Sequence, residues 1–170
     1  MSPIQDEIQQ RRPFRSRGQE GLLSLLRTAD QLKRRVASVV EPHGLTLQQF
    51  NVLRILRGAG PLGLPTLDIA DRMIERAPGI TRLLDRLEKK ALVRRERCPK
   101  DRRRVEVAIT TRGLRLLAGL DRPVAEADDE LLARLGSRRT ITLIRLLDAV
   151  RNEPPARRSG SHRSSKEKKA

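Results

Sequence analysis

The chain of 170 residues carries 37 Lys and Arg against 21 Asp and Glu, a formal net charge of +16. This length favours one domain with at most a short appendage. A single Cys excludes an intrachain disulfide and a cysteine-based zinc cluster within one chain. No stretch approaches the roughly 20 apolar residues of a membrane span, and the N-terminus has no basic start followed by an apolar run. We therefore expect a soluble, cytoplasmic protein, and its charge favours nucleic acid over an anionic membrane as partner.

The surplus charge lies mainly in two blocks. Residues 76–104 hold twelve Lys and Arg against four Asp and Glu, a net +8, and residues 151–170 hold seven against two, a net +5. From residue 152 on, the chain has almost nothing apolar to bury and cannot offset its ordering entropy. We expect a disordered basic tail over 152–170, a flexible arm over 1–18, and an ordered domain over 19–151.

The ordered domain is predicted to begin with three helices. Apolar residues recur at helical spacing over about 19–41, which predicts a long amphipathic helix ending before Pro42. Thr46 is expected to cap a second helix, with Gln49 in the capping-box position three residues later. Thr66 is expected to cap a short third helix.

A fourth helix is predicted over about 78–90. Pro78 suits the first helical turn, where its missing N–H has no partner to lose. Leu83, Leu84 and Leu87 form an inward stripe. The outward face offers polar side chains: Thr81, Arg82 and Arg86.

Two alternating segments, 92–97 and 105–109, then predict a β-hairpin. Its tip, over 98–104, is rich in Arg. The rest of the domain is predicted to be helical, with a helix capped by Thr110 or Thr111 and kinked or broken at Pro123. Ser137 is expected to cap a last helix over 138–151.

Three short helices followed by a hairpin predict a winged helix-turn-helix in a mainly α chain with a small β wing. Its last short helix, 78–90, is shaped for the DNA major groove. Arg can bind guanine through two hydrogen bonds, and the hairpin tip can place an Arg in the neighbouring minor groove. The residues expected at DNA are Thr66, Pro78, Gly79, Thr81, Arg82, Arg86, Lys100, Asp101, Arg102, Arg103 and Arg104.

Several of these segments resemble the MarR family of regulators, over roughly residues 20–150. The resemblance implies a homodimeric winged-helix transcription factor, expected to act as a repressor. It implies a DNA-binding lobe over 45–110, flanked by dimerisation helices over 19–41 and 111–151 that interlock between subunits. By the same resemblance Arg103 enters the minor groove and Asp101 helps to hold the wing. The segments that carry it are 44–50, 68–70, 80–88, 92–95 and 101–113.

Two departures from that family pattern matter. Ala91 stands where the family usually has Gly at a left-handed helix cap, and a side chain there costs about 1 kcal/mol. Many members respond to aromatic compounds, but this chain has no Tyr or Trp for stacking. A small-molecule effector, if there is one, must therefore be held by aliphatic walls together with Arg or His43, and its identity stays open.

Single residues also have simpler interpretations. Arg82 and Arg86 can be solvated charges paired with Asp85 or Glu88, although the motif favours DNA contact. Cys98 lies between basic residues that lower a thiol pKa, but an ordinary thiol is favoured over a redox sensor. His43 is interpreted as a capping or surface residue rather than a metal ligand.

The sequence leaves two functions in contention. The first is a dimeric, sequence-specific regulator of transcription that binds double-stranded DNA. The second is an architectural, nucleoid-type protein that binds DNA without sequence preference through its basic segments. An enzyme is not expected, because no catalytic set, phosphate loop or metal cluster appears at meaningful spacing; for the same reason no cofactor is expected.

Overall fold

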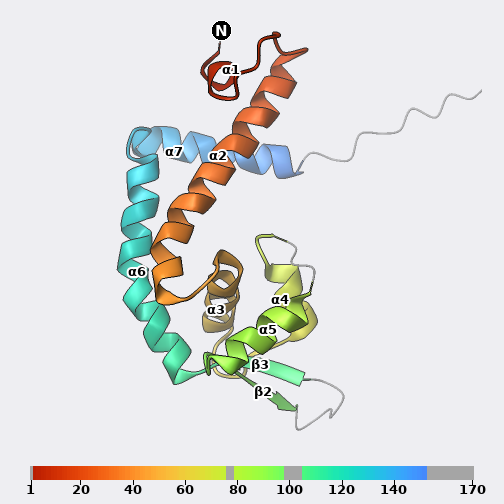
Figure 1. The fold of residues 1–170 in the computed structure, drawn as a ribbon, viewed down its shortest axis with the longest axis vertical. Coiled ribbons are helices and arrows are strands. Elements are labelled where there is room, and N and C mark those ends of the chain that lie inside the picture. The colour runs from red at the N-terminus through yellow and green to blue at the C-terminus, as the bar shows by residue number, and fades with distance from the viewer. Residues whose placement is uncertain (1, 76–78, 98–104, 153–170) are drawn as a thin grey trace, which may run out of the picture. The chain divides into compact units, whose positions relative to one another are not determined.

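The computed structural model describes residues 2–75, 79–97 and 105–152. The chain divides into two compact units, residues 1–131 and 132–170. The elements, labelled in Figure 1, are α1 (Pro3–Glu7), α2 (Arg17–Val40), a 3-10 turn η1 (Glu41–His43), α3 (Leu47–Ala59), β1 (Leu64–Pro65), α4 (Thr66–Arg72), α5 (Ile80–Lys89), β2 (Val93–Arg97), β3 (Val105–Ile109), α6 (Thr111–Leu132) and α7 (Gly136–Asn152).

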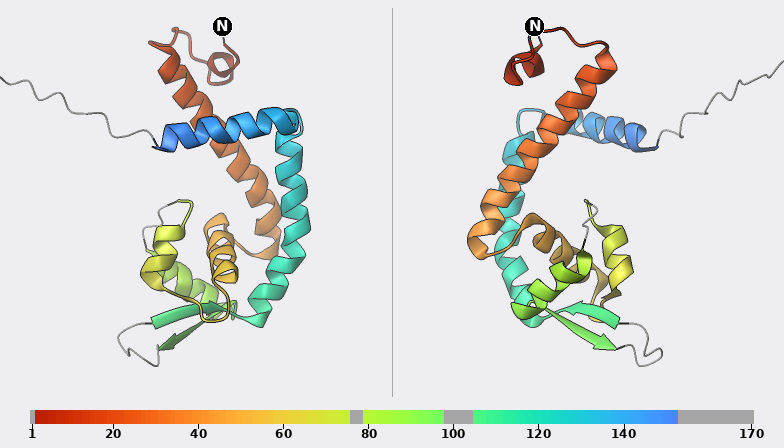
Figure 2. Two further views of the ribbon diagram at one scale, coloured as in Figure 1. Left: turned by 180° about the vertical axis from the view of Figure 1, so that it is seen from behind. Right: turned by 45° about the vertical axis from the view of Figure 1, so that its right-hand side comes forward.

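The first unit contains the winged helix-turn-helix that the sequence predicts. Helices α3, α4 and α5 gather on one face of the hairpin formed by β2 and β3 (Figures 1 and 2). The two hairpin strands pair antiparallel from Val93 opposite Ile109 to Arg97 opposite Val105. The short β1, which was not predicted, adds an antiparallel third strand, so the sheet order is β1-β3-β2.

One hydrophobic core joins the helices to this sheet. Leu53 and Leu56 of α3, Leu84 and Leu87 of α5, and Val107 of β3 are all fully buried. Side chains of α2 and α6 enter the same core, chiefly Val40, Leu117, Leu120 and Val124. The amphipathic stripes of the sequence therefore meet at one place and fix how each helix is rotated.

Helix boundaries follow the predicted signals in part. The capping box at α3 is confirmed, since Thr46 Oγ1 accepts from Gln49 N and Gln49 Oε1 accepts from Thr46 N. The predicted cap at Thr66 is wrong: Thr66 is the first residue of α4, and Pro65 precedes it without a side-chain cap. Pro65 is paired with Glu106 in the sheet, so the strand runs directly into the helix.

Three further features differ from what the sequence led us to expect. α6 runs unbroken through Pro123, so the break that was one of the two expected outcomes is absent. Leu120 and Val124, on either side of the proline, are buried and offset the hydrogen bond that a proline removes. Residues 3–7, inside the segment expected to be a flexible arm, form α1. There Ile4 is buried, and Glu7 forms an ion pair with Arg27 of α2, in which Arg27 Nε donates to Glu7 Oε1 at 2.7 Å. α7 begins at Gly136, two residues earlier than expected.

The junction between α5 and β2 keeps the left-handed conformation that the family resemblance implied, with Ala in place of the usual Gly. Ala91 has a φ of 55°. Thr110 Oγ1 donates to the Ala91 carbonyl at 2.8 Å and accepts from Gly113 N at 3.1 Å, so one hydroxyl bridges this turn and the start of α6. The bridge holds the strained turn in place.

An ion pair ties α6 to α3. Arg57 of α3 donates to both carboxylate oxygens of Asp121 at 2.8 and 2.9 Å. These hydrogen bonds lower the pKa of the Asp121 carboxyl below its ordinary value. Because the pair is largely exposed, it fixes geometry more than it adds stability.

Gly63 should be intolerant of any side chain. It has a φ of +74°, and an added Cβ would lie 2.3 Å from the Val107 carbonyl oxygen. We expect Gly63→Ala to lower the free energy of unfolding by about 2 kcal/mol or more, from backbone strain and a clash with the sheet. The control is Gly58→Ala in α3, where a Cβ meets nothing within 4 Å and should stabilise by about 0.5 kcal/mol. Chemical denaturation measures both, and equal effects would contradict the close approach.

Candidate nucleic-acid interface

The candidate DNA-binding surface is the outward face of α5. Its inward stripe, Leu83, Leu84 and Leu87, is buried, which turns the opposite face of the helix to solvent. Thr81, Arg82 and Arg86 are exposed on that face. The local pattern of leucines therefore determines which polar side chains are presented.

The start of α5 is open to close approach. Gly79 occupies the N-cap position with a φ of 88°, and nothing lies within 4 Å of where its Cβ would be. Free N–H groups at a helix N-terminus, together with the positive end of the helix dipole, suit a phosphate oxygen. This end of α5 thus combines an accessible backbone with the neighbouring Thr81 and Arg82.

The two acidic residues of α5 are engaged by a wing arginine. Arg95 of β2 donates through Nη1 to Asp85 Oδ1 at 2.6 Å and to Glu88 Oε2 at 3.0 Å. Its Nη2 also contacts the Thr81 carbonyl oxygen at 3.3 Å. In the part of the chain that the structure describes, Arg82 and Arg86 take part in no ion pair. The interpretation that pairs them with Asp85 or Glu88 is therefore not what the structure contains.

The residues just after α4 are fastened on two sides. The backbone N–H of Ile74 donates to Asn51 Oδ1 of α3 at 3.0 Å, and Lys33 of α2 forms an ion pair with Glu75. Thr66 lies half-buried at the start of α4. The helix-turn-helix is thus held by polar contacts at its turn as well as by its core.

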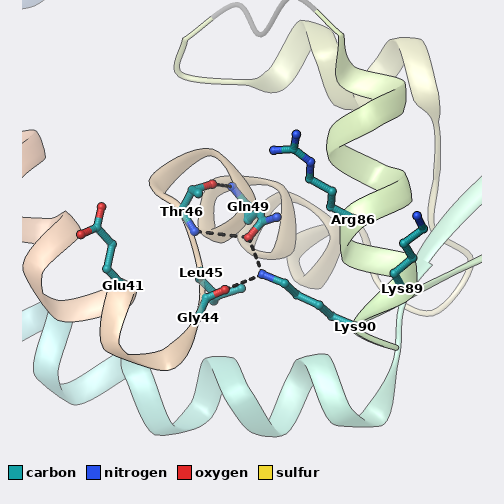
Figure 3. Close-up of a pocket in the computed structure, with 8 residues that line it drawn as sticks. All are labelled: Glu41, Gly44, Leu45, Thr46, Gln49, Arg86, Lys89 and Lys90. Atoms are coloured by element: carbon teal, nitrogen blue, oxygen red, sulfur yellow. Dashed lines mark hydrogen bonds between the residues drawn. The ribbon is translucent and has the colours of Figure 1, made fainter.

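A shallow, open pocket of about 540 Å³ lies beside the C-terminal half of α5. Figure 3 shows Lys90 reaching across it, where Nζ donates to the Gly44 carbonyl at 2.5 Å and to Gln49 Oε1 at 3.1 Å. Arg86 and Lys89 extend along its wall without such contacts. Most of its lining residues are polar or charged, but apolar atoms make up most of the lining surface, and His43 does not line it.

The remaining predicted residues lie outside the described part of the chain. These are Pro78, the wing-tip residues Lys100, Asp101, Arg102, Arg103 and Arg104, and also Cys98 and the tail 153–170. The residues 79–97 and 105–152 do contain both strands that carry the wing tip.

Arg95 and Lys90 were not singled out from the sequence, yet both fasten α5 to its surroundings. A signal for Arg95 was present, since Asp85 and Glu88 are three residues apart on one helix face within a basic segment. Two carboxylates at this spacing repel each other, and a nearby cation relieves that repulsion.

Other kinds of site find no support in residues 2–75, 79–97 and 105–152. They contain no group of three or more His, Cys, Asp or Glu side chains that could hold a metal ion. None of their helices is both long and apolar enough to cross a membrane.

A core of three helices, a three-stranded sheet with a hairpin wing, and a cationic outward helix face together define a winged-helix DNA-binding protein. Comparison with known proteins gives the family. The MarR family model matches residues 45–105. The crystal structure of a MarR transcription factor from Planctomyces limnophilus is 44% identical and superposes with a TM-score of 0.62, covering 80% of this chain and 98% of that one.

Two other matches bear on function. The HTH-type transcriptional regulator FarR of Neisseria gonorrhoeae is 29% identical over 125 residues, 74% of this chain and 84% of that protein. The MepR–DNA complex of S. aureus is 25% identical with a TM-score of 0.68, covering 75% of this chain and 93% of that one. The chain belongs to the MarR family of winged-helix transcriptional regulators. It is therefore a sequence-specific DNA-binding regulator and not an enzyme.

The exposed arginines of α5 should carry base preference. We expect Arg82→Ala or Arg86→Ala to weaken binding to the preferred DNA site by about 1–3 kcal/mol, with a smaller loss on unrelated DNA, because a bidentate contact to guanine is removed. Arg122→Ala is the control, since its side chain is 89% exposed on α6 and paired with Glu126. Fluorescence anisotropy on both DNAs measures the effect. A uniform loss on all DNA would instead assign these arginines to phosphates.

Proposed function

We propose that this regulator is a homodimeric repressor that reads double-stranded DNA with α5 in the major groove and wing residues 98–104 in the adjacent minor groove. The observation that carries the proposal is the outward face of α5, where Arg82 and Arg86 have no ion pair among the described residues while Arg95 engages both acids. The S. aureus relative bound to DNA supports the same mode of use. The residues proposed at DNA are Thr66, Pro78, Gly79, Thr81, Arg82, Arg86, Lys100, Asp101, Arg102, Arg103 and Arg104.

Two helices supply the argument for a homodimer. On α2, Leu22 and Leu26 are each 57% exposed in the single chain, and on α7, Ile141 and Ile144 are each 52% exposed. Apolar side chains repeated along a helix face are more stable when a partner covers them. A second copy of the chain is the partner we propose.

We propose that the regulator represses transcription rather than activating it. Repression requires only a DNA-binding surface and no additional surface for contacting other proteins. A dimer bound over a promoter excludes RNA polymerase sterically. We propose a nucleoid-associated, cytoplasmic location, since the regulator works where the chromosome is. The basic tail 152–170 is proposed to add attraction to any DNA sequence.

A small-molecule effector remains part of the proposal, with its identity open. The pocket beside α5 has Arg86 and Lys89 on its wall, so an acidic compound suits it better than a neutral aromatic one. A ligand that binds only the folded dimer raises its melting temperature, so thermal-shift screening is the direct search.

Selection from a random DNA pool tests the function. We expect a pseudo-palindrome with half-sites about 10 base pairs apart, because a two-fold dimer presents two recognition helices one helical turn apart. A reporter driven by a promoter that contains the selected site should lose expression when the protein is present. Equal affinity for selected and random DNA at physiological salt would favour the architectural alternative.

Light scattering tests the oligomeric state. At micromolar concentration we expect twice the chain mass of 19.3 kDa. Leu26→Asp or Ile144→Asp should shift the protein toward monomer by placing a charge in an apolar interface. Leu62→Asp is the matched control, because Leu62 is 87% exposed but lies on neither α2 nor α7. A wild-type monomer would overturn the homodimer.

A further inference from the structure

The recognition helix carries an electrostatic conflict. α5 holds three cations, Arg82, Arg86 and Lys89, and also two carboxylates, Asp85 and Glu88. DNA presents one negative charge per about 1.7 Å of its axis. Carboxylates on a helix that enters the groove repel those phosphates, and like charges brought together at an interface reduce affinity.

The structure assigns the answer to Arg95: we propose that it is a positioning residue that masks both carboxylates of α5 and couples the wing strand to the recognition helix. This inference rests on the proposed use of α5 at DNA. The side chain of Arg95 is 25% exposed, less than those of Asp85 at 44% and Glu88 at 41%, so the guanidinium is the more shielded partner in both ion pairs.

The contacts of Arg95 reach both ends of α5. Nη1 joins Asp85 and Glu88, which lie toward the C-terminal half of the helix, while Nη2 contacts the Thr81 carbonyl in the first turn. A planar guanidinium can donate in several fixed directions at once, whereas a lysine ammonium on a flexible stem cannot reproduce that fork. One side chain therefore orients the helix and cancels its acidic charge.

Strand geometry explains why this particular arginine does so. Arg95 lies opposite the fully buried Val107 in the β2–β3 ladder. Alternation along a strand places the neighbouring Arg94 on the other face, where it pairs with Glu96 at 2.5 Å. Since β2 leads into the wing, a displacement of the wing strand is passed to α5 through Arg95.

The engagement of both acids by Arg95 also affects Arg82 and Arg86. With Asp85 and Glu88 held by Arg95, no acid of α5 competes with DNA for Arg82 or Arg86. When Arg95 is absent, both carboxylates are released close to those two arginines. They can then pair with them, or face the phosphates directly.

A charge-rescue series tests the mask in the full-length protein. We expect Arg95→Ala to weaken binding to the selected DNA site about tenfold or more. Neutralising both acids in that background, with Asp85→Asn and Glu88→Gln, should restore most of the affinity, because the released charges are then gone. Arg95→Lys, which keeps the charge and loses the fork, should fall between Arg95→Ala and wild type.

The matched control is Arg94→Ala, which removes one positive charge from the same strand on its other face. Its effect should be unchanged by Asp85→Asn and Glu88→Gln. Thermal melting of each variant identifies any loss of folding. If Arg95→Ala does not fold, the variant that carries Asp85→Asn and Glu88→Gln with Arg95 intact still tests the proposal. It should bind DNA as well as or better than wild type.

Two results would overturn the inference. One is wild-type affinity in Arg95→Ala. The other is a loss of DNA affinity in Arg95→Ala that persists fully after both acids are neutralised. That result would mean that Arg95 acts through packing alone and not through the charges of Asp85 and Glu88. Failure of the proposed function would look different, because the wild-type protein itself would then show no preference for the selected site. The charge-rescue series on unrelated DNA would still measure whether Arg95 neutralises the two acids.

Discussion

Burial of one leucine stripe determines which side chains α5 presents to solvent. Leu83, Leu84 and Leu87 turn one side of α5 into the core formed with α3 and the sheet, and each such burial is worth about 1.5–3 kcal/mol. Rotating α5 to present other residues would expose that stripe to water. The positions of Arg82 and Arg86 on the outward face are therefore a consequence of packing, and the charge that α5 presents to solvent follows from the core.

Electrostatics then refines what packing presents. The chain carries a net +16, yet its recognition helix includes two carboxylates, so net charge alone does not describe the surface that reads DNA. The Arg95 contacts separate the charges of α5 into an engaged acidic set and an available basic set. The same contacts join β2 to α5, so the helix and the strand that leads into the wing are mechanically connected.

The parts predicted well from sequence were those determined by near neighbours. The capping box of Thr46 and Gln49 spans four residues, and the inward stripe of α5 spans five, so each pattern implies its own structure. The two strands of the hairpin were predicted for the same reason. Thr66 was misassigned because its candidate cap depended on what precedes it. Sheet pairing of Pro65 with Glu106 on a distant strand changes how α4 begins.

The sequence by itself determined the fold class, the face of α5 that is exposed and the concentration of charge around the wing. Only the tertiary structure decided that α6 continues through Pro123, that α1 forms against α2, and that Arg95 rather than Arg82 or Arg86 takes the acids of α5. These outcomes have one physical reason in common. Each depends on contacts between segments that packing brings together, and a local pattern of residue types carries no information about which distant side chain arrives.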